Sequence, residues 1–189
     1  NELVKIDPNI TIHWVGLFDT VASFGLGGNS IDVGFNFNMP TNVKRAYHIT
    51  AAQRQKDLAS GERRFFFPVT GIGNISSGGS YQVNPGWHET SVVGAHSDIG
   101  GGYNLGGGEV SRRNVSNLTL KWMRDDGVGY GVPFGQIPLQ FSNLEPNGVN
   151  DSRWPNDKAK EWVNGKTRVR VAYDSQGKRL PAGWATVGW

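Results

Sequence analysis

The sequence contains no cysteine among its 189 residues. This absence excludes disulfide bonds, thiol nucleophiles and cysteine-ligated zinc sites, but it leaves the cellular compartment open. The sequence also lacks any apolar run near the ~20 residues that a membrane-spanning helix needs, and its N-terminus has no signal-peptide pattern. The four histidines, His13, His48, His88 and His96, lack the His-Glu-x-x-His spacing of a zinc peptidase. We therefore expect neither a metal nor a cofactor.

Glycine, by contrast, is abundant, with 27 residues in the chain. This is twice the usual share of about 7%, so much of the chain is expected in loops. Charge is uneven: residues 151–189 carry eight Lys and Arg against four Asp and Glu, whereas residues 1–150 carry eleven against twelve. A basic C-terminal part can contact phosphate headgroups, or it can be ordinary solvated surface, which its interspersed acids favour. We expect no nucleic-acid partner.

The order of strand and helix patterns predicts an α/β fold, with a parallel sheet, flanking helices and long Gly-rich loops in a single domain over residues 1–189. A Gly/Asn-rich loop is expected over residues 25–42, and a second loop over residues 75–87. In the helix predicted over residues 111–126, we expect four residues to face inward: Val115, Leu118, Trp122 and Met123. The predicted strands cover residues 10–18, 89–95 and 167–173, and the predicted helices cover residues 41–61, 111–126 and 156–163.

Two predicted strands are each followed by a polar residue that suits catalysis. Asp19 follows the first strand in "HWVGLFDTVASFG", and His96 follows the second in "TSVVGAHSDIGGGY". Functional groups in open α/β sheets gather outside the carboxyl ends of the strands. An Asp followed much later by a His is also the chain order of the last two members of an α/β-hydrolase triad. In such a triad the carboxylate orients the imidazole, and the imidazole takes the proton of a serine hydroxyl.

Taken singly, each residue also has an ordinary interpretation. Asp19 suits a turn or a helix cap, and His96 suits a loop. Their joint placement at strand ends, in this order, favours catalysis. We expect the glycines after His96 to give its loop room for close approach, and Asp98 and Tyr103 to support that loop, Asp98 by accepting backbone amides.

Three segments resemble a known family. They are "VGLFDTVASFG", "AYHITAAQR" followed by "ERRFFFP", and "VVGAHSDIGGGY" followed by "SNLTLKWM". They are similar, over roughly residues 11–135, to the family labelled domain of unknown function 2235. This family of α/β-hydrolases includes the class-one phospholipase effectors of bacterial type VI secretion. The resemblance implies the C-terminal part of an α/β-hydrolase fold, with Asp19 as the triad aspartate and His96 as the triad histidine.

The nucleophile is where the sequence departs from that family, whose serine lies in a Gly-x-Ser-x-Gly elbow upstream of the aspartate. No such motif occurs here, and the nearest segment, "GNSID" at residues 28–32, lacks the last glycine. Ser23 and Ser97 lie near the proposed acid and base, but neither is on a strand-turn-helix elbow. We therefore expect an incomplete α/β-hydrolase domain, whose nucleophile belongs to an upstream segment, and negligible activity of the chain alone.

The resemblance also implies a phospholipase A-like ester hydrolase with a phospholipid or other acyl-ester substrate. It implies an antibacterial effector in the cytoplasm of a producing bacterium, delivered to the periplasm of a target cell. The expected partners are the upstream segment, an immunity protein and a component of the secretion apparatus. Phe35 and Phe37, in the loop "SIDVGFNFNMP", are candidates for contact with acyl chains.

A different interpretation stays open beside the hydrolase. Seven tryptophans and many Gly/Asn loops also suit a non-catalytic module that binds carbohydrate or peptide. That module has no need to bring Asp19 and His96 together. An Asp19 carboxylate within ~3.2 Å of a His96 ring nitrogen therefore favours the hydrolase.

Overall fold

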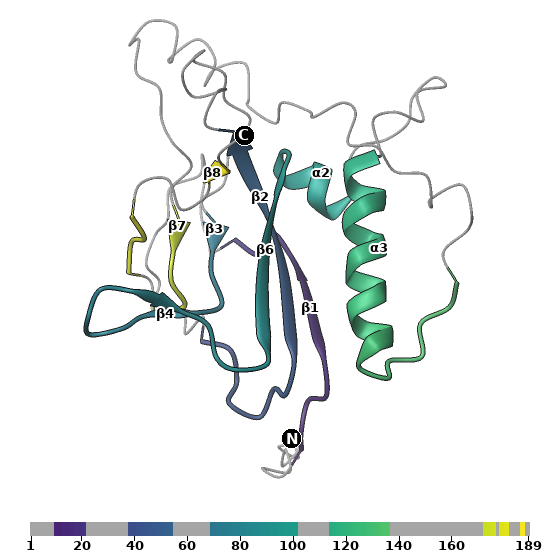
Figure 1. The fold of residues 1–189 in the computed structure, drawn as a ribbon, viewed down its shortest axis with the longest axis horizontal. Coiled ribbons are helices and arrows are strands. Elements are labelled where there is room, and N and C mark those ends of the chain that lie inside the picture. The colour runs from purple at the N-terminus through teal and green to yellow at the C-terminus, as the bar shows by residue number, and fades with distance from the viewer. Residues whose placement is uncertain are drawn as a thin grey trace, which may run out of the picture.

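A central parallel sheet organises the protein in a computed structural model (Figure 1). Its strands are β1 (Val15–Phe18), β2 (Ala46–Arg54) and β6 (Trp87–Val93), in the order β1-β2-β6. The short strand β8 (Thr186–Val187) pairs in parallel with the end of β2. The structure describes residues 10–21, 38–54, 69–101, 114–136, 172–176, 178–181 and 186–187.

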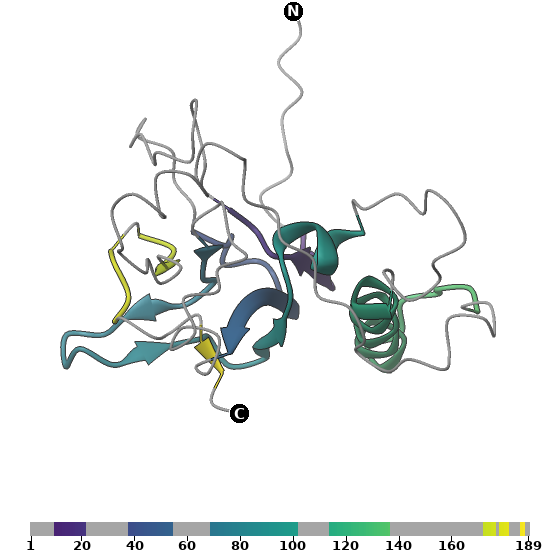
Figure 2. The same ribbon diagram turned by 90° about the horizontal axis from the view of Figure 1, so that it is seen from above.

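The two described helices lie together on one face of this sheet, as Figures 1 and 2 show. They are α2 (His96–Gly100) and α3 (Asn114–Gly129). The predicted α/β class, with a parallel sheet and helices against it, is thus confirmed. The buried apolar residues between the helices and the sheet are Ile49, Ala51, Val92, Ile99, Val115 and Met123.

On the other side of the sheet, the described residues form short strands (Figures 1 and 2). Strand β3 (Val69–Thr70) pairs in parallel with β7 (Ala172–Tyr173), and β4 (Asn74–Ile75) pairs antiparallel with β5 (Tyr81–Gln82). The loop predicted over residues 75–87 therefore contains parts of a small hairpin and the start of β6. A second apolar cluster fills this side, with Val43, Ala46, Ile72 and Trp87 as its buried members.

The prediction of a helix over residues 41–61 is wrong, because residues 46–54 form β2. This strand lies between β1 and β6 and is covered on both faces, so Ala46, Ile49, Ala51 and Ala52 are all fully buried. A parallel strand buried on both faces has a nearly continuous apolar sequence, without the alternation that identifies a half-buried strand. Its alanines then favour a helix by intrinsic propensity, which the pairing with two neighbours overrides.

The helix predicted over residues 111–126 exists as α3, although it continues past Gly127. Val115 and Met123 face inward as expected, and Leu118 is half-buried. Trp122 was expected inward, but it is 37% exposed. The inward face instead follows the i, i+4 spacing of Val115, Thr119 and Met123, and the buried Thr119 hydroxyl donates to the carbonyl of Ile99 at 2.9 Å.

Several predictions fall on residues that the structure does not describe. They include the helix over residues 156–163, most of the strand over residues 167–173, and most of the loop over residues 25–42 with Phe35 and Phe37. Tyr103 also lies outside the described residues. Among the helices that are described, none has the length and apolar character to cross a membrane.

Candidate functional site

Asp19 and His96 meet at the carboxyl end of the sheet. Asp19 directly follows β1, and His96 follows β6 by three residues, with β2 between these two strands. The Nδ1 atom of His96 lies 2.8 Å from Oδ2 of Asp19. Asp19 is fully buried, whereas the His96 side chain is 33% exposed. The structure therefore places a buried acid against a base that solvent can reach.

The backbone of Asp19 turns sharply at this point and aims the carboxylate. Its φ of 42° lies in the left-handed region, which Asp tolerates better than most residues. Its N–H donates to the carbonyl of Ile49 at 2.7 Å, which continues the β1–β2 ladder. Its Oδ1 accepts the N–H of Ala51 at 2.7 Å. With Oδ1 held by β2, Oδ2 is directed toward His96.

His96 is the first residue of α2, so the expected histidine loop is a short helix. Ala95 caps this helix, and Oδ2 of the buried Asp98 accepts the N–H of Ala95 at 2.8 Å. Gly94 lets the end of β6 pack closely against Asp98 of α2, because a Cβ at position 94 would lie 2.9 Å from Cβ of Asp98. Gly101, with φ of 84°, ends the helix in the left-handed conformation that glycine adopts readily.

The geometry of the pair determines which imidazole nitrogen is basic. An ionised carboxylate only accepts hydrogen bonds, so the proton of a neutral His96 is assigned to Nδ1. The Nε2 atom then carries the lone pair that can take a proton from a hydroxyl or a water molecule. The pair is therefore capable of general-base chemistry.

A second histidine–carboxylate pair was missed in the sequence. His48 on β2 and Glu89 on β6 are cross-strand partners, with Nδ1 of His48 2.8 Å from Oε1 of Glu89. The Nε2 atom of His48 accepts the backbone N–H of Thr20 at 3.0 Å. The available signal is the histidine within "AYHITAAQR", because an ionisable ring is unusual in a strand that is buried on both faces. A predicted helix over residues 41–61 hides this signal, because a histidine on a helix surface is ordinary.

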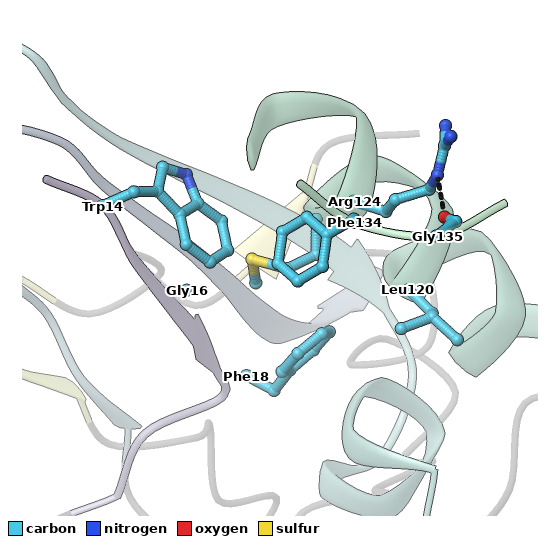
Figure 3. Close-up of a pocket in the computed structure, with 8 residues that line it drawn as sticks. Trp14, Gly16, Phe18, Leu120, Arg124, Phe134 and Gly135 are labelled. Carbon is cyan, nitrogen blue, oxygen red and sulfur yellow. Dashed lines mark hydrogen bonds between the residues drawn. The ribbon is translucent and has the colours of Figure 1, made fainter. Parts of the chain in front are cut away.

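An apolar groove begins beside the site. Figure 3 shows Trp14, Phe18 and Phe134 around it, and Phe18 directly precedes Asp19. The rings of Trp14 and Phe134 meet edge to face at 5.5 Å between centroids, and Arg124 donates to the carbonyl of Gly135 at 3.0 Å. The volume of the groove is about 270 Å³, and its lining residues are Trp14, Gly16, Phe18, Leu120, Met123, Arg124, Phe134 and Gly135.

No group of three or more His, Asp or Glu side chains that could hold a metal ion occurs in the parts of the chain that the structure describes.

Comparison with solved structures supports the fold. A crystal structure of an uncharacterized protein from Pseudomonas aeruginosa matches this chain with a TM-score of 0.50 and 22% identity. The match covers 74% of this chain but 21% of that protein, so the chain spans about a fifth of the length of that relative. A search of the curated proteins found no match.

Comparison with protein families is more informative about function. Residues 3–126 match the family described as "T6SS, Phospholipase effector Tle1-like, catalytic domain". This range includes β1, β2, β6 and both members of the Asp19–His96 pair. The resemblance to type VI secretion phospholipase effectors that the sequence motifs indicated is therefore confirmed, and the chain belongs to the family of Tle1-like T6SS phospholipase effector catalytic domains.

Proposed function

We propose that the chain supplies the acid and the base of a serine ester hydrolase that acts on phospholipids. The observation that carries this proposal is the 2.8 Å contact between Nδ1 of His96 and the buried carboxylate of Asp19. The two residues come from the ends of different strands, in the chain order that α/β-hydrolases use for these roles. Membership of a phospholipase effector family supports the substrate class.

In the proposed reaction, Asp19 keeps the proton of His96 on Nδ1 and stabilises the imidazolium that forms later. Nε2 of His96 takes the proton of a serine hydroxyl as the serine oxygen attacks the ester carbonyl carbon. The tetrahedral intermediate collapses, the ester C–O bond breaks, and Nε2 returns the proton to the departing alcohol. Water, activated by the same nitrogen, then hydrolyses the acyl-enzyme and releases the fatty acid.

The serine of this mechanism is proposed to lie on an upstream segment of an α/β-hydrolase domain. The sequence has no Gly-x-Ser-x-Gly motif on which an elbow serine could sit. The backbone donors of the oxyanion hole come largely from the same elbow and from an early loop. We therefore expect purified residues 1–189 to show negligible ester hydrolysis.

The competing function is a carbohydrate- or peptide-binding module without catalysis. Such a module gives no reason for a buried carboxylate to contact a part-exposed imidazole. The 2.8 Å distance is within the ~3.2 Å that we required for the hydrolase, and it therefore favours that interpretation.

The decisive experiment compares variants of the catalytic domain that contains both this chain and its proposed upstream segment. Fatty-acid release from phospholipid vesicles is the measurement, and His96→Ala is expected to lower kcat by about 10³-fold or more. Ser91→Ala on the neighbouring strand β6 is the matched control and is expected to leave kcat unchanged. Full activity of the folded His96→Ala variant would contradict the proposal.

A lipid-contact role is proposed for Phe35 and Phe37. Replacing both by Asp is expected to weaken binding to phospholipid vesicles, because charged side chains do not enter the acyl region readily. Hydrolysis of a soluble short-chain ester is expected to stay unchanged. Equal loss on both substrates, or on neither, would remove this role.

A further inference from the structure

The His48–Glu89 pair carries an inference about how the acid is held. Both partners are nearly inaccessible, with no exposure of the His48 side chain and 9% exposure of the Glu89 side chain. A buried polar pair stabilises a fold no better than apolar residues of similar size in many proteins. Its placement therefore calls for a role beyond packing, and its hydrogen bonds indicate what that role is.

The partners of His48 determine its protonation state. A backbone N–H can only donate, so the Nε2 atom that faces Thr20 must carry a lone pair. The imidazole proton is thereby assigned to Nδ1, where it is donated to Oε1 of Glu89. His48 is a neutral imidazole with a fixed tautomer, and its role is that of a hydrogen-bond acceptor for the main chain.

Glu89 is itself held by three donors. Besides His48, its Oε1 accepts the N–H of Ile72 at 2.9 Å, and its Oε2 accepts the hydroxyl of Tyr81. Burial, followed by the negative charge of Glu89, raises the pKa of Tyr81 above its ordinary value, so this hydroxyl keeps its proton and donates. The N–H of Gly73 in turn donates to the Tyr81 oxygen at 2.7 Å. The ring of His48 is therefore held on its Nδ1 side by Glu89 and the donors that bind Glu89.

The main-chain group that His48 binds is the peptide that follows the proposed acid. Thr20 N–H belongs to the peptide bond between Asp19 and Thr20, where the chain leaves β1 with Asp19 at φ of 42°. Left-handed residues other than glycine persist only where their surroundings hold them. The carbonyl of the same Thr20 accepts the N–H of Thr70 at 3.0 Å, so the turn is held on both sides.

We propose that His48 is a positioning residue for Asp19. Its Nε2, held toward Thr20 by the network behind it, fixes the turn that aims Oδ2 of Asp19 at Nδ1 of His96. The inference rests on the proposed function, because it takes Asp19 and His96 as the acid and the base. Without this acceptor, the turn can relax toward negative φ and move the carboxylate away from the imidazole.

The test uses two substitutions of the same ring. His48→Leu removes the acceptor while keeping an apolar side chain of similar bulk. His48→Gln places an amide oxygen near the position of Nε2, where it can accept the same N–H. Ser91→Ala is the control, because Ser91 bonds Thr50 at 2.8 Å in the next pair on the same face of β2 and β6.

The first measurement does not depend on activity. In the protein labelled with ¹⁵N on histidine, NMR is expected to show His48 protonated on Nδ1 alone, and a hydrogen-bonded Nδ1 proton on His96. The His96 signal is expected to disappear in His48→Leu and to remain in His48→Gln and in Ser91→Ala. A His48 proton on Nε2 in the unsubstituted protein would overturn the proposal, as would an unchanged His96 signal in folded His48→Leu.

The second measurement is turnover of phospholipid. His48→Leu is expected to lower kcat about 10- to 100-fold with KM unchanged, because small displacements of a catalytic group have effects of this size. His48→Gln is expected to recover most of the loss. If His48→Leu does not fold, the proposal is tested by His48→Gln and by the tautomer of His48 in the unsubstituted protein. A folded His48→Gln variant without the His96 signal then overturns the proposal. If His96→Ala stays active while His48→Leu still removes the His96 signal, the proposed function fails and the positioning role stands.

Discussion

Two histidine–carboxylate pairs belong to one sheet and differ in what surrounds the imidazole: Asp19–His96 lies at the carboxyl ends of the strands, and His48–Glu89 joins β2 to β6 within them. In the Asp19–His96 pair the acid is fully buried and the base is one-third exposed. In the His48–Glu89 pair the ring is fully enclosed, and protein groups bind both of its nitrogens. In the proposed roles, the same two chemical groups form a general base in one place and a rigid support in the other. The difference in burial, and not in residue type, separates these two proposed roles.

The amino end of the sheet gives a third case for comparison. Arg45, directly before β2, forms an ion pair with Asp126 near the end of α3 and lies 4.4 Å from the centre of the Tyr130 ring. Trp14 donates to the same carboxylate at 2.7 Å. A guanidinium does not lose its proton in proteins, so this pair anchors the helix without any possibility of proton transfer near neutral pH. The part-exposed imidazole of His96 lies at the opposite end of the sheet, beyond the carboxyl ends of β1 and β6.

The largest effect is expected from Asp19→Asn, compared with Glu89→Gln. Asn tolerates the left-handed backbone of Asp19 but cannot stabilise an imidazolium, so kcat for phospholipid hydrolysis is expected to fall about 10⁴-fold. Glu89→Gln acts on the site only through His48, so it is expected to lower kcat far less than Asp19→Asn does. Steady-state kinetics of both variants measure the two losses of kcat. A larger loss in Glu89→Gln than in Asp19→Asn would contradict the assignment of Asp19 as the catalytic acid partner and of Glu89 as a supporting residue.

For stability the comparison is expected to invert. His48→Ala leaves a cavity and removes the partner of two buried groups, so it is expected to lower the free energy of unfolding by about 3 kcal/mol. His96→Ala removes a part-exposed ring and is expected to cost less than about 1 kcal/mol. Urea unfolding of the two variants measures the difference. Equal losses would mean that burial does not distinguish the pairs.

At the amino end of the sheet, the Arg45–Asp126 pair predicts that the free energy of unfolding depends on pH. Burial raises the pKa of Asp126, but hydrogen bonds from Arg45 and Trp14 and the charge of Arg45 outweigh it, so the net pKa lies below the ordinary value. A depressed folded pKa means that the stabilisation is present above the unfolded pKa of about 3.9 and is lost as pH falls through the folded value.

Asp126→Asn tests this dependence by thermal unfolding across the acid range. The variant is expected to lose about 2 kcal/mol near pH 7, where the charged hydrogen bonds are complete. It is expected to approach the unsubstituted protein as pH falls below 4. A constant difference at every pH would show that Asp126 stabilises α3 through packing alone.

The smallest effect is expected from Ser91→Ala, which sets the baseline for a neutral pair. Its hydroxyl bonds that of the buried Thr50 on the same face as the His48–Glu89 pair. Losing one neutral hydrogen bond is expected to lower the free energy of unfolding by about 1 kcal/mol without changing activity. Chemical denaturation and a vesicle assay measure the two quantities. If Ser91→Ala lowered the free energy of unfolding as much as His48→Ala does, the His48–Glu89 pair would be no more important for stability than a neutral hydrogen bond.

Much of this protein was determined by local sequence. Short patterns and motifs predict where the strands before Asp19 and His96 end, and they predict a helix over residues 111–126, where the structure has α3. They also indicate the α/β class and the family. These features depend on turn chemistry, capping and periodicity, which act within one turn of helix or one strand. They are therefore visible without knowledge of the neighbouring segments.

Only the tertiary structure decided what pairs across the sheet. Residues 46–54 became a strand because β1 and β6 flank them, and the buried Thr119 of α3 donates to the carbonyl of Ile99 on α2, whereas Trp122 is 37% exposed. The contact of His48 with Thr20 joins residues 28 positions apart, and that of Asp19 with His96 joins residues 77 apart. The sequence placed an acid and a base at two strand ends, but the distance between them depends on how strands distant in the chain pair.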